Sequence, residues 1–179
     1  MARPAELMLR TAQIWQNMPI GGIVAEKRLD EIDRKILRLL QEDGRLTLAD
    51  LAAKVGLSPS PCLRRIRLLE KAGIITRYVA VLSQRKVGLP VSVFASIKLE
   101  KQREEELTRF AKAIARWPEV LECYLMTGPR DYLLRIVVED LAAYEVFLKQ
   151  KLTRVEGIAS IESSFALEQV KYTNVLPIP

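Results

Sequence analysis

The spacing of apolar residues predicts three short helices between residues 29 and 73. In the first helix, apolar side chains recur every three or four residues and share one face: Leu29, Ile32, Ile36, Leu39 and Leu40. Asp30 is suited to cap the start of this helix, and Gly44 to end it. Thr47 is expected to cap the second helix, which Gly56 can end in the left-handed conformation. The apolar face of the second helix carries Leu48, Leu51, Ala52 and Val55.

The third helix is predicted to begin at Ser58 and Pro59, a favourable N-cap and first-turn pair, and to end at Gly73. Ala52 is small where the second and third helices must approach closely. Three helices joined by short turns, one of which contains glycine, form the tri-helical helix-turn-helix layout. Residues Ile74–Leu82 are predicted to form a strand that provides half of a small hairpin wing and then a linker.

The second half of the chain changes its period. Between Val91 and Leu99 apolar residues occupy every second position, which indicates a strand. The remaining pattern predicts a helix at 104–116, strands at 120–127 and 132–139, a helix at 141–154 and a strand at 158–168. The order βαββαβ is the ferredoxin-like arrangement, so the expected fold class is α+β. We expect the apolar side of the strand Val91–Leu99, together with the last strand, to form a sheet surface for a second copy of the chain.

These elements divide the chain into five segments. Residues 1–28 follow no sustained period and are expected to be a mobile N-terminal extension with a short helix around Leu7–Trp15. Met18 is an alternative start of translation, and the sequence leaves that choice open. The other segments are a helix-turn-helix domain at 29–76, a linker strand at 77–89, the βαββαβ domain at 90–172 and a tail at 173–179.

Composition removes several classes of chemistry. The chain has no histidine, which excludes histidine acid–base catalysis, Ser-His and Cys-His nucleophiles and histidine-containing metal sites. Cys62 and Cys123 form neither a CxxC motif nor a disulfide framework, which fits a reducing cytoplasm. No apolar stretch is long enough to span a membrane, and no signal peptide is evident. We therefore expect a cytoplasmic protein that is not an enzyme and needs no cofactor or metal.

Positive charge is concentrated in the first half of the chain. The net charge is +6; residues 29–82 hold ten Lys and Arg against seven Asp and Glu, whereas residues 90–179 hold twelve against thirteen. Such a distribution permits a polyanionic partner for the helix-turn-helix domain without requiring one.

The third helix separates into two faces when its residues are placed at 100° steps. Cys62, Ile66 and Leu69 should pack on the first two helices, with Cys62 a core residue rather than a redox switch. The opposite face is basic, with Arg65 at its boundary. Arginine can donate two parallel hydrogen bonds to a guanine edge, and serine at a helix start can bind phosphate. The expected contacts with double-stranded DNA are Ser58, Ser60, Pro61, Arg64, Arg65, Arg67 and Lys71. The alternative is that these charges only solvate an exposed helix face.

Several motifs resemble the Lrp/AsnC regulators, the feast/famine family. They are Leu29-Asp30-x-x-Asp33-x-x-Ile36-Leu37, Asp43-Gly44-Arg45, the run from Val55 to Cys62, Arg65-Ile66 with Glu70, Gly73 and Ile75, and Gly128-x-x-Asp131-Tyr132. The resemblance covers roughly residues 29–172 in order. It implies a winged helix-turn-helix joined by a linker strand to an effector-binding domain. It also implies sheet-to-sheet dimers that assemble into larger even-numbered oligomers, and an amino acid or related metabolite bound between subunits near Gly128–Asp131.

The turn Gly128-Pro129-Arg130-Asp131 departs from the family pattern, because many members have an acidic residue at the position of Pro129. An amino-acid ligand needs an acceptor for its ammonium group and donors for its carboxylate. Asp131 could be the acceptor, while Arg130 and the backbone N–H groups near Gly128 could be the donors. Ser163 and Ser164 could add hydroxyl groups from the last strand. The alternative is that Asp131 only caps a tight turn.

The sequence thus indicates a sequence-specific DNA-binding transcriptional regulator whose DNA affinity or assembly responds to a small molecule. Sirohaem decarboxylases resemble the same two-domain layout, but they depend on histidine, which this chain lacks. A ligand-independent architectural oligomer that binds DNA is the other alternative.

Overall fold

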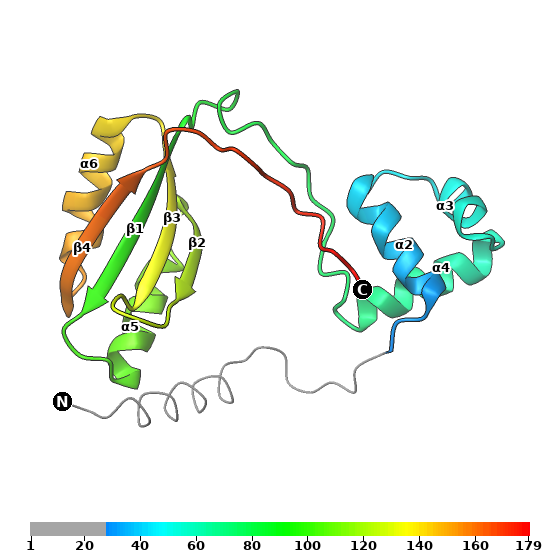
Figure 1. The fold of residues 1–179 in the computed structure, drawn as a ribbon, viewed down its shortest axis with the longest axis horizontal. Helices are drawn as coiled ribbons and strands as arrows, with labels where there is room; N and C mark the ends of the chain where they lie inside the picture. Colours follow the sequence, from blue (N-terminus) through cyan, green and yellow to red (C-terminus); the bar gives the residue numbers. More distant parts are fainter. Residues whose placement is uncertain (1–27) are drawn as a thin grey trace. The chain divides into compact units, whose positions relative to one another are not determined.

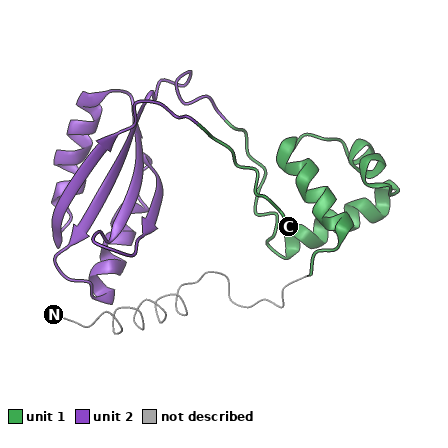
Figure 2. Cartoon of the chain, viewed as in Figure 1, with its two compact units in different colours: residues 1–81, 171–179 green, residues 82–170 purple. Residues whose placement is uncertain are grey.

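The computed structural model describes residues 28–179, which divide into two units (Figure 2). Residues 28–81 together with Lys171–Pro179 form unit 1, and Leu82–Val170 form unit 2. The predicted extension, including the helix around Leu7–Trp15 and Met18, lies almost wholly outside the described residues. No helix among residues 28–179 is both long enough and apolar enough to cross a membrane.

Unit 1 contains the three predicted helices, α2 (Glu31–Glu42), α3 (Leu48–Val55) and α4 (Pro59–Lys71) (Figure 1). Asp30 caps α2 by accepting a hydrogen bond from the backbone N–H of Asp33 at 2.8 Å. Thr47 caps α3 in the same way through the N–H of Asp50 at 3.1 Å. Gly56, with φ 74°, ends α3 in the left-handed conformation. The predicted caps therefore set the starts of α2 and α3.

The core of unit 1 lies where the three helices meet. Its buried side chains are Ile36, Leu37, Leu51, Ala52, Val55, Cys62 and Leu69. Ala52 is 1% exposed, which fits the predicted close approach of α3 and α4. Cys62 is fully buried, as predicted for a core residue, and this burial raises the pKa of its thiol.

The segment after α4 differs from the prediction. Residues 76–83 form no regular secondary structure, and residues 84–88 are turns held by the bonds Val87 N–H to Ser83 C=O and Leu89 N–H to Gln84 C=O. The linker strand predicted at 77–89, and the wing strand predicted at Ile74–Leu82, are therefore not strands in this structure. The physical reason is that, among residues 28–179, no other segment pairs with their backbone in a ladder.

The tail joins unit 1 rather than the unit from which it emerges. Residues 171–179 are extended, and Ile178 packs against the core of the three helices. The side chains of Gln41 and Arg38 on α2 hydrogen-bond to the tail backbone. Unit 1 is thus built from two parts of the sequence that lie far apart.

Unit 2 has the predicted βαββαβ order. Its elements are β1 (Val91–Leu99), α5 (Glu104–Ile114), β2 (Val120–Leu125), β3 (Tyr132–Val138), α6 (Leu141–Gln150) and β4 (Ile158–Phe165), with a 3-10 turn at Leu152–Arg154 after α6. The four strands are antiparallel in the order β2-β3-β1-β4. This is the ferredoxin-like arrangement, and the α+β class is confirmed.

The two faces of this sheet have different roles. Val93, Ala95 and Ile97 on β1 are fully buried in one core with Phe110 of α5 and Phe147 of α6. The expectation that this apolar row faces a second copy is therefore wrong, because the helices of the same chain cover it. The opposite side, here called the open face, carries the alternate residues Ser92, Phe94, Ser96 and Lys98 of β1, with Leu133 and Arg135 of β3, Glu122 and Tyr124 of β2, and Ser160, Glu162 and Ser164 of β4.

Candidate functional site

The outer face of α4 carries an exposed basic surface. A shallow hollow of about 400 Å³ lies along this face, lined by Ser60, Leu63, Arg64, Arg67, Leu68 and Lys71. Arg64, Arg67 and Lys71 are exposed. Among residues 28–179, no carboxylate forms an ion pair with any of these three cations. Their charges are therefore available to an external anion, which is the condition that a nucleic-acid surface must meet.

Arg65 has a different environment from the other three cations. Its Nη1 donates to Oδ2 of Asp30 at 2.6 Å and to Oδ1 of Asp33 at 2.8 Å. The Asp33 side chain is only 2% exposed, and that of Arg65 is 24% exposed. Bonds to Asp30 and then Asp33 raise the pKa of Arg65. Arg65 thus fixes α4 to the first turn of α2, a positioning role that the sequence analysis did not foresee.

The N-terminal end of α4 exposes further groups that suit an anion. Ser58 occupies the N-cap position, but its hydroxyl makes no capping hydrogen bond within the described chain. Ser58 and Ser60 are exposed, and Pro61 is half-buried. Pro59 and Pro61 have no backbone N–H, so the first turn of α4 offers a phosphate the N–H of Ser60 and the positive end of the helix dipole. Ser60 and the exposed cations Arg64, Arg67 and Lys71 therefore line one side of α4.

The turn between β2 and β3 is held tightly to the sheet. Gly128 has φ 111°, a conformation that side-chain-bearing residues rarely adopt. The N–H of Met126 donates to the C=O of Asp131 at 2.8 Å, and the N–H of Asp131 donates to the C=O of Ile97 at 2.8 Å. Gly128 and Pro129 are exposed at the tip.

Asp131 is buried within its own domain. Its Oδ2 accepts from the backbone N–H of Leu99 at 2.6 Å, and its Oδ1 accepts from Nε2 of Gln102 at 2.5 Å. The side chain therefore fixes the end of β1 and the residues that follow it, a role that neither interpretation of the sequence foresaw. Gln102 was not foreseen, because its role depends on a contact across the sheet rather than on a local motif.

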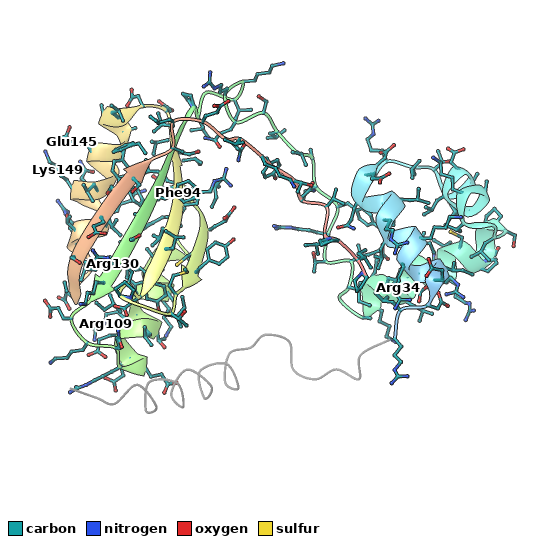
Figure 3. All side chains as sticks on the ribbon, viewed as in Figure 1. Arg34, Phe94, Arg109, Arg130, Glu145 and Lys149 are labelled. Atoms are coloured by element: carbon teal, nitrogen blue, oxygen red, sulfur yellow. The ribbon has the colours of Figure 1, made fainter. Side chains whose placement is uncertain are left out.

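The remaining predicted ligand residues do not converge. Arg130 forms an ion pair with Glu162 on the open face and donates to Oγ of Ser160 at 2.9 Å (Figure 3). Ser163 instead lies on the helix side, where its Oγ is 2.5 Å from the hydroxyl of Tyr144 on α6. Ser163 and Ser164 point to opposite faces because adjacent residues of a strand alternate. Glu162 and Ser160 are the partners of Arg130 that the sequence analysis missed.

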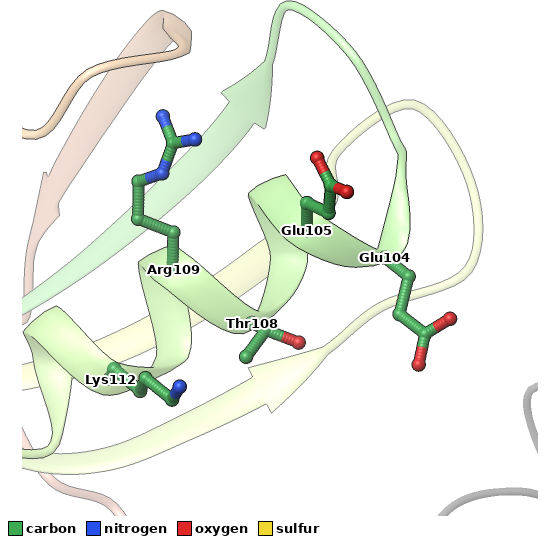
Figure 4. A pocket seen from close by; sticks show the side chains of 5 residues that line it. All are labelled: Glu104, Glu105, Thr108, Arg109 and Lys112. Atoms are coloured by element: carbon green, nitrogen blue, oxygen red, sulfur yellow. The ribbon is translucent and has the colours of Figure 1, made fainter.

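A second hollow, of about 470 Å³, lies on α5 (Figure 4). It is lined by Glu104, Glu105, Thr108, Arg109 and Lys112, which all belong to that one helix. A ligand there would contact a single exposed helix face. Because no second element of the described chain closes over this hollow, it lacks the enclosure that is typical of ligand pockets. Among residues 28–179 no group of three or more metal-ligating side chains gathers.

Comparison with known proteins identifies both parts of the chain. Residues 29–76 match the family model described as winged helix-turn-helix DNA-binding, and residues 92–176 match the Lrp/AsnC ligand binding domain. The Bkd operon transcriptional regulator of Pseudomonas aeruginosa is 49% identical over 150 residues, which is 84% of this chain and 98% of that protein.

Solved structures agree with this match. An AsnC family transcriptional regulator from Agrobacterium tumefaciens is 51% identical, with a TM-score of 0.79 over 83% of this chain and 97% of that one. A regulator from Neisseria meningitidis in complex with L-methionine is 42% identical, with a TM-score of 0.79 over 83% of this chain and 96% of that one. These relatives regulate transcription, and the sirohaem-decarboxylase alternative is set aside. The chain belongs to the Lrp/AsnC family of transcriptional regulators and is itself a DNA-binding regulator rather than an enzyme.

Proposed function

We propose that the chain binds a specific double-stranded DNA site through the outer face of α4, as a dimer or a larger even-numbered oligomer. We further propose that an amino acid or related metabolite bound at unit 2 changes this binding. The observation that supports the DNA contact is that the four cations of α4 differ in their ion pairing. Arg64, Arg67 and Lys71 are exposed without an ion-pair partner among the described residues, whereas Arg65 is held by two aspartates.

The proposed roles along α4 follow from its geometry. An α-helix fits the major groove, and residues in the first turns reach base edges more readily than residues near its end. Arg64 lies nearest the centre of the exposed face and is assigned to base edges. Arg67 and Lys71 are assigned to phosphates, as are the hydroxyls of Ser58 and Ser60 and the backbone beside Pro61. Arg65 holds α4 in place through its bonds to Asp30 and Asp33.

The DNA contact is tested by selecting bound duplexes from a pool with a random core. We expect one enriched sequence with two half-sites, which the triple variant Arg64→Ala, Arg67→Ala, Lys71→Ala does not bind or enrich. Lys112→Ala, which removes an exposed cation from α5, is the matched control and should retain full affinity. A triple variant that still binds the enriched duplex with unchanged affinity would rule out the α4 surface.

The open face supports the proposed oligomer. On this face Phe94 is 38% exposed and Tyr124 is 53% exposed. Two large aromatic side chains are thus left in contact with solvent in a single copy of the chain, as at surfaces that bind another protein. The face also carries Arg135, paired with Glu122 at 2.9 Å, so its centre is polar but internally neutralised. A two-fold dimer would cover both copies of this face and present two DNA-binding units to sites about 34 Å apart on one side of the duplex.

The proposed effector site lies at the end of the open face beside Gly128–Asp131. The relative in complex with L-methionine supports an amino acid as the class of ligand. Arg130 can hold a ligand carboxylate, aided by the backbone N–H groups near Gly128. Glu162 is a better acceptor for the ammonium group than Asp131, because both oxygens of Asp131 already accept hydrogen bonds. Ser164, which shares the open face with Glu162, remains a candidate hydroxyl contact, whereas Ser163 points to the helix side, where it contacts Tyr144.

A thermal-shift screen of the amino acids and their keto acids tests this site. A ligand that raises the melting temperature of the protein should lose its effect in Arg130→Ala and in Glu162→Ala. Arg109→Ala, which removes an exposed arginine from α5, is the control and should respond like the natural sequence. Equal responses of the natural sequence and all three variants would show that the ligand binds elsewhere. The absence of any response at millimolar concentrations would favour the ligand-independent regulator.

A further inference from the structure

The tail of the chain is attached to α2 by a paired set of hydrogen bonds. The backbone N–H of Leu176 donates to Oε1 of Gln41 at 2.6 Å, and Nε2 of Gln41 donates back to the C=O of Leu176 at 3.3 Å. Nη2 of Arg38, one turn earlier on the same helix, donates to the C=O of Ile178 at 3.3 Å. One face of α2 therefore holds the backbone of two tail residues.

The same tail residues add an apolar anchor. Ile178 packs against the core of unit 1, whereas Leu176 two residues earlier remains 70% exposed. The N–H of Ile178 donates to the C=O of Leu176 at 2.9 Å, which closes a tight turn around Pro177. Prolines at 177 and 179 restrict the free chain, so less conformational entropy is lost when the segment docks.

This attachment is suited to be reversible. Its hydrogen bonds are solvent-exposed, and one partly buried side chain supplies the apolar contact. Contacts of this kind open locally at low free-energy cost compared with a buried core.

The docked segment follows β4 in the chain, so it links that strand to α2. β4 carries Glu162, the ion-pair partner of Arg130, and leads through residues 166–174 into the docked segment. The start of α2 in turn holds α4, because Arg65 on α4 donates hydrogen bonds to Asp30 and Asp33. The tail thus connects the strand beside the proposed effector site to the helix that supports the DNA-binding surface.

We propose that residues 175–179 form a releasable clasp on α2, a second connection between the two units besides residues 82–90. With the clasp closed, unit 1 is joined to unit 2 through two chain segments, 82–90 and 166–174, instead of one, which restricts the freedom of the DNA-binding units in an oligomer. An effector that displaces β4 acts on DNA binding through this connection. The inference rests on the proposed function, because it needs an oligomer that binds two half-sites.

The clasp is tested with the variant Gln41→Leu, which removes both Gln41 bonds and keeps a good helix former. Asn174→Ala is the matched control, because it changes an exposed tail residue that makes none of these contacts. Affinity is measured on the enriched duplex with two half-sites and on a duplex with one half-site. Hydrogen exchange of peptides covering 29–42 and 171–179 reports whether the tail is docked.

The expected result is a loss of affinity of about fivefold or more for Gln41→Leu on two half-sites, with a change below about twofold on one half-site. Two tethers pre-organise the spacing of the DNA-binding units, and this advantage disappears when only one half-site is present. Gln41→Leu should also speed exchange in the tail, and Asn174→Ala should change nothing. Equal affinities of Gln41→Leu and the natural sequence on two half-sites would overturn the clasp and leave the DNA contact standing. Failure of the natural sequence to bind either duplex would instead overturn the proposed function, and the clasp with it.

Discussion

Nη1 of Arg65 lies 2.8 Å from Oδ1 of Asp33, and this bond joins the third helix of unit 1 to the first. Asp33 is almost completely buried, so its carboxylate depends on partners inside the protein. The pair explains why one arginine of α4 faces inwards while its neighbours face solvent.

Replacing Arg65 should reduce stability rather than DNA specificity. Arg65→Ala leaves the buried Asp33 without its guanidinium partner, and breaking such a pair costs on the order of 3 kcal/mol. Urea unfolding followed by far-UV circular dichroism measures the free energy of unfolding. Lys35→Ala on the exposed side of α2 is the control and should stay within about 0.5 kcal/mol of the natural sequence. A stable Arg65→Ala protein with altered base preference would return Arg65 to the DNA-contacting set.

Arg64→Ala should relax the sequence preference at one base pair of each half-site. Loss of a two-bond contact to a guanine edge costs about 1–3 kcal/mol against the preferred base and little against the others. Binding to duplexes that carry each of the four base pairs at every half-site position gives this profile. An unchanged profile would show that Arg64 does not contact a base edge.

Lys71→Ala should weaken binding to all sequences alike. A contact with phosphate carries no base information, but it releases counterions, so its loss should reduce the slope of log affinity against log salt by about one. Titrations of the enriched duplex and of an unrelated duplex between low and moderate salt measure both effects. A loss confined to the enriched duplex would contradict the phosphate assignment.

The stability of unit 1 should fall in acid partly through Asp30. The N–H of Asp33, and then Arg65, lower the pKa of Asp30 below its ordinary value of 3.8. A carboxyl whose pKa is lowered by folding contributes stability that is present above the unfolded value and is lost as the pH falls through the folded value. Asp30→Asn keeps a good N-cap without the charge. The difference in unfolding free energy between the two proteins should therefore be largest at neutral pH and shrink below about pH 4. A difference that is independent of pH would mean that the charge does not contribute.

Phe94→Glu should prevent assembly through the open face. Phe94, labelled in Figure 3, lies opposite Arg135 on β3 and Ser164 on β4, on one of the two inner strands of the sheet. Covering this position in a dimer would bury the new carboxylate beside Arg135, whose charge is already paired with Glu122, so the carboxylate would lack a dedicated partner. Sedimentation should change from an even-numbered oligomer to a monomer. Leu141→Glu, at a position 63% exposed at the start of α6, makes the same kind of change elsewhere and should not alter the sedimentation.

Local patterns in the sequence predict the elements of both units well. The cap at Thr47, the glycine at 56 and the alternation along β1 depend on neighbours within a few residues, which spacing reveals. Local patterns do not reveal partners that are distant in the sequence. Arg65 is 35 residues from Asp30, and Asp131 is 32 residues from Leu99, so the inward role of each residue becomes visible only in the fold. The segment at 74–82 has a strand-like composition, but a strand also requires a neighbour to pair with.

The docking of the tail on α2 also determines when unit 1 is completed. Gln41 and Leu176 are 135 residues apart, so the helices leave the ribosome long before their last partner is synthesised. Contacts of such high sequence separation form late, because the intervening chain must close a long loop. A nascent chain has α2, α3 and α4 available to pack while the sheet of unit 2 is still incomplete. A premature stop anywhere in unit 2 would consequently release a polypeptide with an exposed basic α4 and no tail on α2.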